Sequence, residues 1–521
     1  MSWRSTRISG RSGQENRQVA VVDLGSNSWR LVVFTYGAGP WWKRTDELYE
    51  TVRIGAGLAA TGRLGDEAMA RGAETLEVFA RFCRANAIAP EDVHVLATSA
   101  IRDASNGQAF LHRARAHTGL RIEVLDAAQE AFFGYVAAVN TTTLTDGVAL
   151  DIGGGSLQLT RVADRRAHES ISLPLGAVRV TEALLASGGP AKRKQLARVR
   201  DHARDALAQA PWLTDIGGRL VGIGGAVRNL AAAAEHADGG VDLGVQGFVI
   251  TRGRLAELVE QLAALRSADR GSVPGIKPGR TDIILAAALV LETVVAVGGF
   301  DGLEATEAGL REGVFLARTL LAESDPLVDD VRGAAVRNLA IQYESDLAHV
   351  EHVAELSLQM FDSLAGEGLV APVPGERELL WAAAMLHDVG MAIAYDDHHK
   401  HSRYLIESAE LPGFDPRERA LIAQITRYHR KGVPKLGALE SVTRPADEAL
   451  LDRCAVVLRL AEHLERGRDQ SVSHARLRPG GDGVDLRLAA GGDLTLPRWS
   501  IERYGDGEAF ERVFGRRLLI A

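Results

Sequence analysis

The chain has 521 residues, of which 46% are hydrophobic and 25% charged, and its formal net charge is −8. This balance excludes a disordered or fibrous protein, and two cysteines are too few for a disulfide-stapled scaffold. The apolar segment 283–297 is too short to cross about 30 Å of hydrocarbon, so we expect no membrane span. The arginine-rich start has no apolar run behind it, which predicts a flexible tail over residues 1–18 rather than a secretory signal. We therefore expect a cytoplasmic protein that does not bind DNA.

Short β-branched runs alternate with longer amphipathic segments over about the first 300 residues, which is typical of an α/β fold. The predicted strands are 19–22, 31–35, 93–97, 122–125, 148–150 and 220–223, and helices are predicted at 66–85 and 129–139. From residue 307 onward the strand pattern gives way to helices. These are predicted at 311–321, 329–343, 349–364, 376–387, 416–428 and 447–465. After residue 471, two short strands about a glycine-rich turn indicate a small α+β cap.

One local pattern occurs twice: a strand, an aspartate, a glycine-rich turn with a hydroxyl, and a second strand. Its residues are Asp23, Gly25, Ser26, Asn27 and Ser28 in the first copy, and Asp151, Gly153, Gly154, Gly155 and Ser156 in the second. Glycines let backbone N–H groups approach a phosphate oxyanion, and a carboxylate at a strand end can hold a metal ion. A single copy is equally typical of a tight turn with an Asx hydrogen bond, but the repetition favours two lobes that face a phosphate cleft.

Three further features lie at strand ends or helix starts. Gly224 and Gly225 lead from a strand directly into a helix, which is either an anion site or a common strand–helix joint. Arg102 follows a strand end and is a candidate phosphate clamp, or a solvated arginine at a helix start. Glu130 begins a helix and is a candidate to polarise water for attack on phosphorus, or an exposed helix-terminal glutamate.

In order and spacing, these segments resemble the exopolyphosphatase/guanosine pentaphosphate phosphohydrolase family. The matching segments are 21–34, 97–107, 130–139, 149–159, 221–231 and 307–317. The resemblance implies an actin-like ATPase-domain fold, with ribonuclease-H-like lobes at 19–139 and 140–306. An all-α domain at 307–470 and the cap at 471–521 would complete the chain. Ala226 departs from the threonine often found in the family's third turn, so a hydroxyl contact is missing there.

The resemblance also implies roles for the residues of the turns. Glu130 would be the general base, Asp151 and Asp23 would hold Mg²⁺, and Arg102 would bind a phosphate oxygen. The phosphate-binding residues would be Gly25, Ser26, Asn27, Ser28, Gly153, Gly154, Gly155, Ser156, Gly224 and Gly225. Mn²⁺ is an alternative cation, a monovalent cation is an open expectation, and the long members of the family imply a homodimer.

The helical half resembles an HD phosphohydrolase-type domain, because it places histidines and an aspartate on several helices. The residues of this HD-like site are His349, His387, Asp388, His401 and His429. Such a site closes with a late aspartate, whereas this chain has Glu462 in that region. The alternative is that these histidines are satisfied bundle residues or contacts to polyphosphate.

The leading functional expectation is an exopolyphosphatase that releases orthophosphate from the end of inorganic polyphosphate. Two basic clusters of the helical half would line its channel, unless they are exposed helix faces with i, i+4 pairs. They are Arg427, His429, Arg430, Lys431 and Lys435 in the first cluster, and Arg453, Arg459, Arg466 and Arg468 in the second. The alternative is a guanosine pentaphosphate (pppGpp) 5′-phosphohydrolase that uses the same site. A kinase-like or ATP-driven protein of actin-like fold, and a sensor that binds without hydrolysis, are the other classes that the sequence leaves open.

Overall fold

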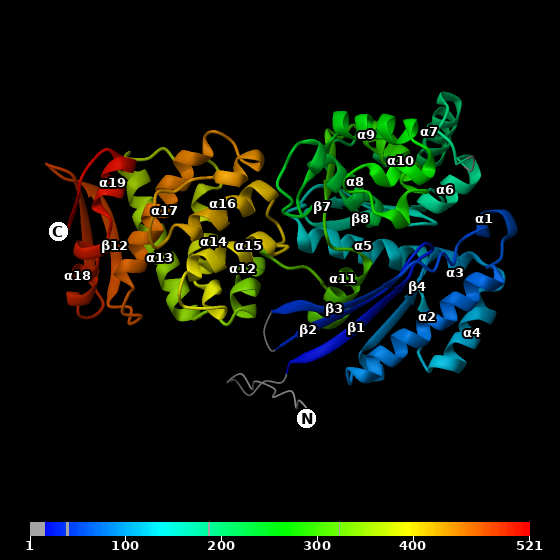
Figure 1. Cartoon of the computed structure of the whole chain (residues 1–521), viewed down its shortest axis with the longest axis horizontal. Helices are drawn as coiled ribbons and strands as arrows, with labels where there is room; N and C mark the ends of the chain where they lie inside the picture. Colours follow the sequence, from blue (N-terminus) through cyan, green and yellow to red (C-terminus); the bar gives the residue numbers. More distant parts are fainter. Residues whose placement is uncertain (1–15, 38–40, 186–187, 322–323, 521) are drawn as a thin grey trace.

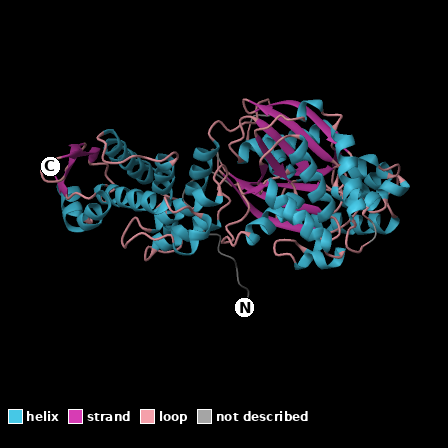
Figure 2. Ribbon diagram, turned by 90° about the horizontal axis from the view of Figure 1, so that it is seen from above, coloured by secondary structure: helices cyan, strands magenta, loops and turns pink. Residues whose placement is uncertain are grey.

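The computed structural model describes residues 16–37, 41–185, 188–321 and 324–520. Two lobes that contain sheets lie beside a helical unit that ends in a small sheet (Figures 1 and 2). Most of the predicted tail lies outside the described residues, whereas Arg17 and Gln18 already belong to the first strand. Among the described residues, no helix is long and apolar enough to cross a membrane.

Lobe I is built on a five-stranded sheet of order β3-β2-β1-β4-β5. Its strands are β1 Arg17–Leu24, β2 Trp29–Tyr36, β3 Trp42–Glu50, β4 Val93–Ala97 and β5 Ile122–Val124. Its helices are α1 Leu58–Thr61, α2 Asp66–Ala85, α3 Ser99–Asp103 and α4 Gly107–Thr118. β1 pairs antiparallel with β2 and parallel with β4. Sequence periodicity does not predict β3, because this edge strand is mostly exposed and charged and lacks apolar alternation.

Lobe II repeats this pairing in a six-stranded sheet of order β10-β11-β9-β6-β7-β8. Its strands are β6 Gly147–Ile152, β7 Leu157–Ala163, β8 Arg166–Leu173, β9 Arg219–Ile223, β10 Val249–Thr251 and β11 Gly302–Ala305. Its helices are α6 Ala177–Leu184, α7 Arg193–Leu207, α8 Gly225–Ala237, α9 Arg252–Ala264 and α10 Ile284–Val297. β6 pairs antiparallel with β7 and parallel with β9, as β1 does with β2 and β4. Each aspartate-glycine turn therefore joins the equivalent pair of strands in its lobe, which is β1 and β2 in lobe I and β6 and β7 in lobe II.

Two helices join the lobes. α5 (Ala127–Thr141) packs against β6, β7 and β8, and it also contacts α11 (Leu310–Phe315), which packs on β1. α11 continues as a π-helical turn, Leu316–Leu320, and Phe315 stacks on Phe34 with ring centroids 4.4 Å apart. Residues 310–317 therefore share a core with the lobes, although the sequence pattern groups them with the helical unit. The predicted boundary at 139/140 falls inside α5, because one continuous helix serves both lobes.

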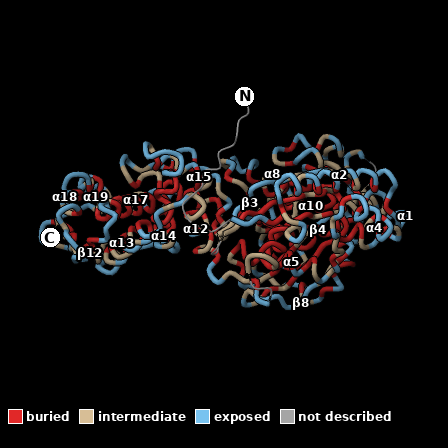
Figure 3. The backbone as a smooth tube through the Cα atoms, turned by 90° about the horizontal axis from the view of Figure 1, so that it is seen from below, coloured by how far each residue is buried: buried red, intermediate tan, exposed pale blue. Residues whose placement is uncertain are grey.

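The helical unit holds α12 to α17. Their bounds are α12 Val331–Gln342, α13 Leu347–Gly366, α14 Glu376–Leu386, α15 His398–Ser408, α16 Pro416–Arg427 and α17 Asp447–Leu464. Only α15 is missing from the sequence prediction, because its first turns are polar and its buried apolar side chains are Leu405 and Ile406. The backbone tube shows buried residues running through the interior of this unit and of the lobes (Figure 3).

The C-terminal cap packs on this bundle. It contains β12 Val472–Pro479, β13 Val484–Ala490, α18 Thr495–Tyr504, α19 Gly507–Phe514 and β14 Leu518–Ile520. β12 lies on α13, and α18 and α19 lie on α17. Because Val472, Leu486 and Phe510 belong to the same apolar cluster as the helices, bundle and cap form one packed unit.

Candidate active site

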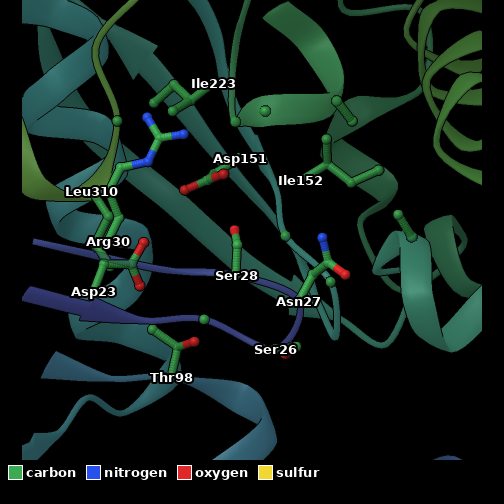
Figure 4. A pocket seen from close by; sticks show the side chains of 18 of the residues that line it. Asp23, Ser26, Asn27, Ser28, Arg30, Thr98, Asp151, Ile152, Ile223 and Leu310 are labelled. Carbon is green, nitrogen blue, oxygen red and sulfur yellow. The ribbon is translucent and has the colours of Figure 1, made fainter. Parts of the chain in front are cut away.

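A cavity of about 120 Å³ lies between the two sheets, where the turns of both lobes meet. It is lined by residues of the first turn, the second turn and the third turn, with α5 and the start of α11 beside them. Figure 4 shows the side chains of Asp23 on β1, Ser28 in the first turn and Asp151 on β6 directed into one space. The repeated sequence pattern thus corresponds to two strand ends that face each other.

The first two turns touch directly at Gly154. Within lobe I, Ser26 of the first turn and Ser99 at the start of α3 are buried, and their hydroxyl oxygens lie 3.2 Å apart. A Cβ added at Gly154 would lie 2.8 Å from the Cβ of Ser26 and 3.4 Å from the backbone nitrogen of Asn27. The two lobes can approach this closely only because Gly154 has no side chain.

The third turn, at Gly224 and Gly225, packs against Asp151 of the second turn. Gly224 has a φ of 105°, and a Cβ there would lie 2.7 Å from the carbonyl oxygen of Ile152 and 3.2 Å from Asp151 Oδ1. Directly after it, α8 begins at Gly225, so the first N–H groups of that helix border the cavity. Ala226 lines the cavity but offers no hydroxyl.

Four arginines that the sequence motifs do not predict as site residues also line the cavity: Arg30, Arg228, Arg280 and Arg311. Arg30 on β2 pairs with Asp23 on β1, so the two side chains lie on the same face of the sheet. Arg228 lies in the first turn of α8, and Arg311 lies in the first turn of α11, just after Gly309. A glycine next to a helix start is the local sequence pattern that could have marked both arginines. Arg280 lies in a short turn that no motif marks.

Two buried donors in this cavity have no hydrogen-bond acceptor among the described residues: Asn27 Nδ2 and Arg311 Nη1. Asn27 is 6% exposed and Arg311 is 5% exposed, so leaving these N–H groups without an acceptor is costly. An anionic ligand with several oxygens would satisfy both.

Three carboxylates are buried at the same place. Burial raises the pKa of Asp151 to about 7, and the neighbouring Glu130 and Asp23 add to the rise. Burial also raises the pKa of Asp23, against the opposing effect of Arg311 and Arg30. Carboxylate oxygens are the preferred ligands of Mg²⁺, so Asp23 and Asp151 fit a divalent cation, which would relieve their repulsion.

Glu130 is held by Arg102. Arg102 Nη1 donates to Glu130 Oε2 at 3.0 Å and to the carbonyl oxygen of Leu125 at 2.9 Å. Burial raises the pKa of Glu130, and the hydrogen bond from Arg102 opposes that rise. Glu130 lines the cavity, whereas Arg102 does not line it and contacts Glu130 instead; the phosphate-clamp role of Arg102 stays a prediction.

Replacing Arg102 with methionine is expected to move the acidic limb of the kcat/KM profile to higher pH. The reason is that Arg102 lowers the pKa of Glu130, so its removal leaves Glu130 protonated over a wider range of pH. Phosphate release measured across pH checks this, with Arg161→Met as the control, since Arg161 pairs with Glu169 outside the cavity. An acidic limb that stays in place would contradict the pairing.

Most of the predicted phosphate-binding residues line the cavity: Gly25, Ser26, Asn27, Ser28, Gly153, Gly154, Gly224 and Gly225. Gly155 and Ser156 do not line it. A Cβ at Gly155 would lie 2.4 Å from Ser99 Oγ, and Ser156 Oγ accepts a hydrogen bond from Gln158. Their part is to hold the second turn in shape.

The predicted HD-like residues are also brought together, with one exception. His349, His387 and Asp388 form one close group, and Asp388 and His429 form another with His398. His401 belongs to neither group, although it lies on α15 with His398. The expectation for His401 is therefore corrected to His398, which is the first residue of that helix; the sequence marks α15 poorly and does not set its phase.

Comparison with known proteins agrees with this geometry. The family model of the Ppx/GppA phosphatase family matches residues 43–322, and the model of its domain III matches residues 331–493. The chain is 27% identical over 482 residues to the guanosine-5′-triphosphate,3′-diphosphate pyrophosphatase of Vibrio vulnificus, spanning 92% of this chain and 91% of that protein. It is 28% identical over 464 residues to the protein of the same name from Aliivibrio fischeri, at 87% and 88% coverage.

Solved structures show the same lobes. The Ppx/GppA family member of Aquifex aeolicus superposes with a TM-score of 0.51 at 26% identity, covering 59% of this chain and 98% of that one. An exopolyphosphatase from Cytophaga hutchinsonii shares the fold, with a TM-score of 0.52 at 23% identity over 57% of this chain and 96% of that one. From the family models and the geometry of the cleft, the chain belongs to the Ppx/GppA phosphatase family and is a phosphoanhydride hydrolase.

Proposed function

We propose that this protein is a guanosine pentaphosphate phosphohydrolase that removes the terminal 5′ phosphoryl group as orthophosphate. The observation that carries the proposal is the cavity between the lobes, where buried carboxylates face unpartnered donors of Asn27 and Arg311. The substrate follows from the curated relatives, whose names specify a guanosine pentaphosphate and whose sequences match about nine-tenths of the chain.

The turns and arginines would hold the transferring phosphoryl group. Backbone N–H groups of the first two turns, with Arg311 and Arg228, surround the cavity and can donate to its oxygens. Phosphoryl transfer passes through a loose transition state whose charge lies on these oxygens, so fixed donors contribute most of the stabilisation. Arg30 and Arg280 extend the same positive lining.

Glu130 would accept a proton from the attacking water. Its carboxylate lines the cavity, and Arg102 fixes its orientation from behind. Asp23 and Asp151 would hold Mg²⁺, which, when bound, would neutralise charge on the phosphate oxygens. The proton moves to Glu130 as the water oxygen forms its bond to phosphorus, and the shortened nucleotide leaves with the bridging oxygen.

The arginines of the helical unit support the nucleotide over a long polyanion. Arg453 binds Glu376 at 2.8 Å, and Arg459 pairs with Asp506. Arg468 binds Asp388 at 2.6 Å, and Arg466 lies 3.5 Å from Glu462. The arginines of one of the two basic clusters predicted to line a polyphosphate channel are thus matched by carboxylates of the same unit.

The space where the helical unit meets the lobes also favours the nucleotide over polyphosphate. A cavity of about 480 Å³ there is lined by Asp242, Glu307, Glu407 and Glu410, against Arg44 and Arg419. An excess of carboxylates repels a polyphosphate chain. Inorganic polyphosphate, the leading expectation from sequence, becomes the second candidate, because its end presents the same phosphoanhydride to the same arginines.

The test is the ratio of kcat/KM values for pppGpp, long-chain polyphosphate, tripolyphosphate and ATP, measured as phosphate release with Mg²⁺. The proposal predicts the highest value for pppGpp and a low value for ATP, which lacks the 3′ diphosphate. A higher value for long-chain polyphosphate would make the protein an exopolyphosphatase. Tight binding of pppGpp without phosphate release would indicate a sensor.

A further inference from the structure

A row of alternating charges runs from the second turn of lobe II to Glu130, and it crosses between the lobes at the start of α6. Its four members are Arg179 on α6, Asp103 and Arg102 at the end of α3, and Glu130 on α5. Arg179 and Asp103 do not line the cavity between the lobes. Figure 1 shows α6 of lobe II beside α1 of lobe I, which it contacts, with α3 close by.

The first turn of α6 is fastened to the second aspartate-glycine turn. The N–H groups of Val178 and Arg179 donate to the carbonyl oxygen of Gly154, at 2.9 and 3.2 Å. The side chain of Arg179 adds a further contact, because its Nε donates to the carbonyl oxygen of Gly155 at 3.0 Å. Any movement of the second turn relative to lobe I therefore carries the guanidinium of Arg179 with it.

The same guanidinium reaches across to lobe I. Arg179 Nη2 donates to Asp103 Oδ2 at 2.9 Å, whereas the other oxygen, Asp103 Oδ1, lies 3.5 Å from Arg102 Nε. Arg102 in turn donates from Nη1 to Glu130 Oε2 at 3.0 Å. Each oxygen of Asp103 thus faces a different arginine, one from each lobe.

Arg102 has two carboxylates within reach, and only one of them belongs to the candidate active site. The side chain of Glu130 is 9% exposed and lines the cavity, whereas that of Asp103 is 41% exposed and does not. Both carboxylates attract the guanidinium of Arg102, so Asp103 competes with Glu130 for it. Because Arg179 binds Asp103, it neutralises this competitor and leaves Arg102 to Glu130.

We propose that Arg179 and Asp103 are positioning residues that make the orientation of Glu130 depend on contact between the second turn of lobe II and lobe I. When the two are in contact, Arg179 holds Asp103 and Arg102 holds Glu130. When the second turn moves away, Arg179 leaves with it, and Asp103 draws Arg102 from Glu130. The base is then aligned only while the turns that hold the phosphoryl group are together. This inference rests on the proposed function, in which Glu130 is the base.

A role in docking the lobes would not be particular to this row. The ion pair of Arg179 and Asp103 is 32% and 41% exposed, and pairs this exposed contribute little to stability. The same helix has another contact to lobe I, in which Glu182 Oε1 accepts a hydrogen bond from the N–H group of Gly57 at 2.9 Å. In the described part of the chain, no ion pair or hydrogen bond joins Glu182 to the row. Glu182 therefore provides a matched comparison for docking alone.

The test is whether a change at Asp103 repairs the loss of Arg179. Values of kcat and KM for phosphate release from pppGpp with Mg²⁺ are measured on the full-length protein. Arg179→Met is expected to lower kcat by about tenfold while KM changes by less than about threefold. Adding Asp103→Asn should recover most of the lost kcat, because the side chain then has no charge with which to compete for Arg102. Asp103→Asn alone should keep more of the kcat than Arg179→Met.

A second background shows whether the effect passes through Arg102. In the Arg102→Met protein, adding Arg179→Met should lower kcat by no more than about twofold further, since there is no guanidinium left to draw away. Glu182→Ala is the control, and it should keep kcat within about twofold of wild type. Thermal unfolding of each variant shows that it is folded.

Three results would overturn the proposal: an unchanged kcat in Arg179→Met, equal losses from Arg179→Met with and without Arg102, or a double variant with Asp103→Asn no more active than Arg179→Met alone. A loss in Glu182→Ala as large as that in Arg179→Met would also overturn it, because docking of the lobes would then explain both. The proposed function is tested separately, by phosphate release from the wild type and its loss in Glu130→Gln, and neither result depends on Arg179 or Asp103.

Discussion

Glu130→Gln is expected to lower kcat for phosphate release by about a hundredfold or more while the affinity for substrate changes little. Glutamine has nearly the same shape and still lines the cavity, but it cannot take the proton of the attacking water. The phosphate-binding groups lie on other elements, namely the turns, β2 and the start of α11. Steady-state kinetics with pppGpp, together with calorimetric binding to the variant, measure the two effects separately.

A matched control comes from another buried carboxylate. Glu235 on α8 is 2% exposed, has no hydrogen-bond partner for either oxygen among the described residues, and does not line the cavity. Glu235→Gln should keep kcat within about twofold of wild type, because it removes a buried charge away from the reaction. Turnover by Glu130→Gln equal to that of this control would remove Glu130 from its role.

Gly154→Ala is expected to reduce kcat/KM by about tenfold to a hundredfold. The added methyl group would lie 2.8 Å from the Cβ of Ser26 and 3.2 Å from Val178 Cγ2, so one turn must move away from the other. Moving the turns apart separates the donors of lobe I from Asp151 of lobe II. Kinetics with pppGpp and the Tm of the variant measure the loss of activity and the cost in stability.

The neighbouring glycine is the control for that change. A Cβ at Gly153 would meet only the carbonyl oxygen of Ser156, at 3.6 Å, which is an ordinary contact. Gly153→Ala should therefore keep most of the activity, although it is the adjacent residue of the same turn. Equal losses in both variants would mean that the close approach of the lobes at Gly154 is unimportant for catalysis.

The parts of the molecule that can be predicted from sequence are those whose signals are local. Asp23 and Asp151 stand at strand ends before glycine turns, and this repetition by itself indicates two facing lobes. The predicted bounds of β4 agree with the structure, because Val93–Ala97 is a central strand with β-branched and apolar residues.

What the sequence does not predict depends on packing between distant segments. Arg311 lies about 180 residues after Glu130 in the chain, and only the return of α11 onto β1 brings it to the cavity. Arg102 is the type of residue expected of a phosphate clamp, but in the structure its guanidinium donates a hydrogen bond to Glu130. His398 and His401 lie in one polar run, and only the phase of α15 decides which of them faces Asp388.

The measurement that tests the central claim most directly is hydrolysis of pppGpp in ¹⁸O-labelled water with Mg²⁺, followed by mass analysis of both products. Attack on the terminal phosphorus predicts one ¹⁸O atom in the released orthophosphate and none in the nucleotide, with the reaction lost in Glu130→Gln. Release of pyrophosphate, or ¹⁸O in the nucleotide product, would contradict the assignment of the cleft between the lobes as a site of terminal phosphoanhydride hydrolysis.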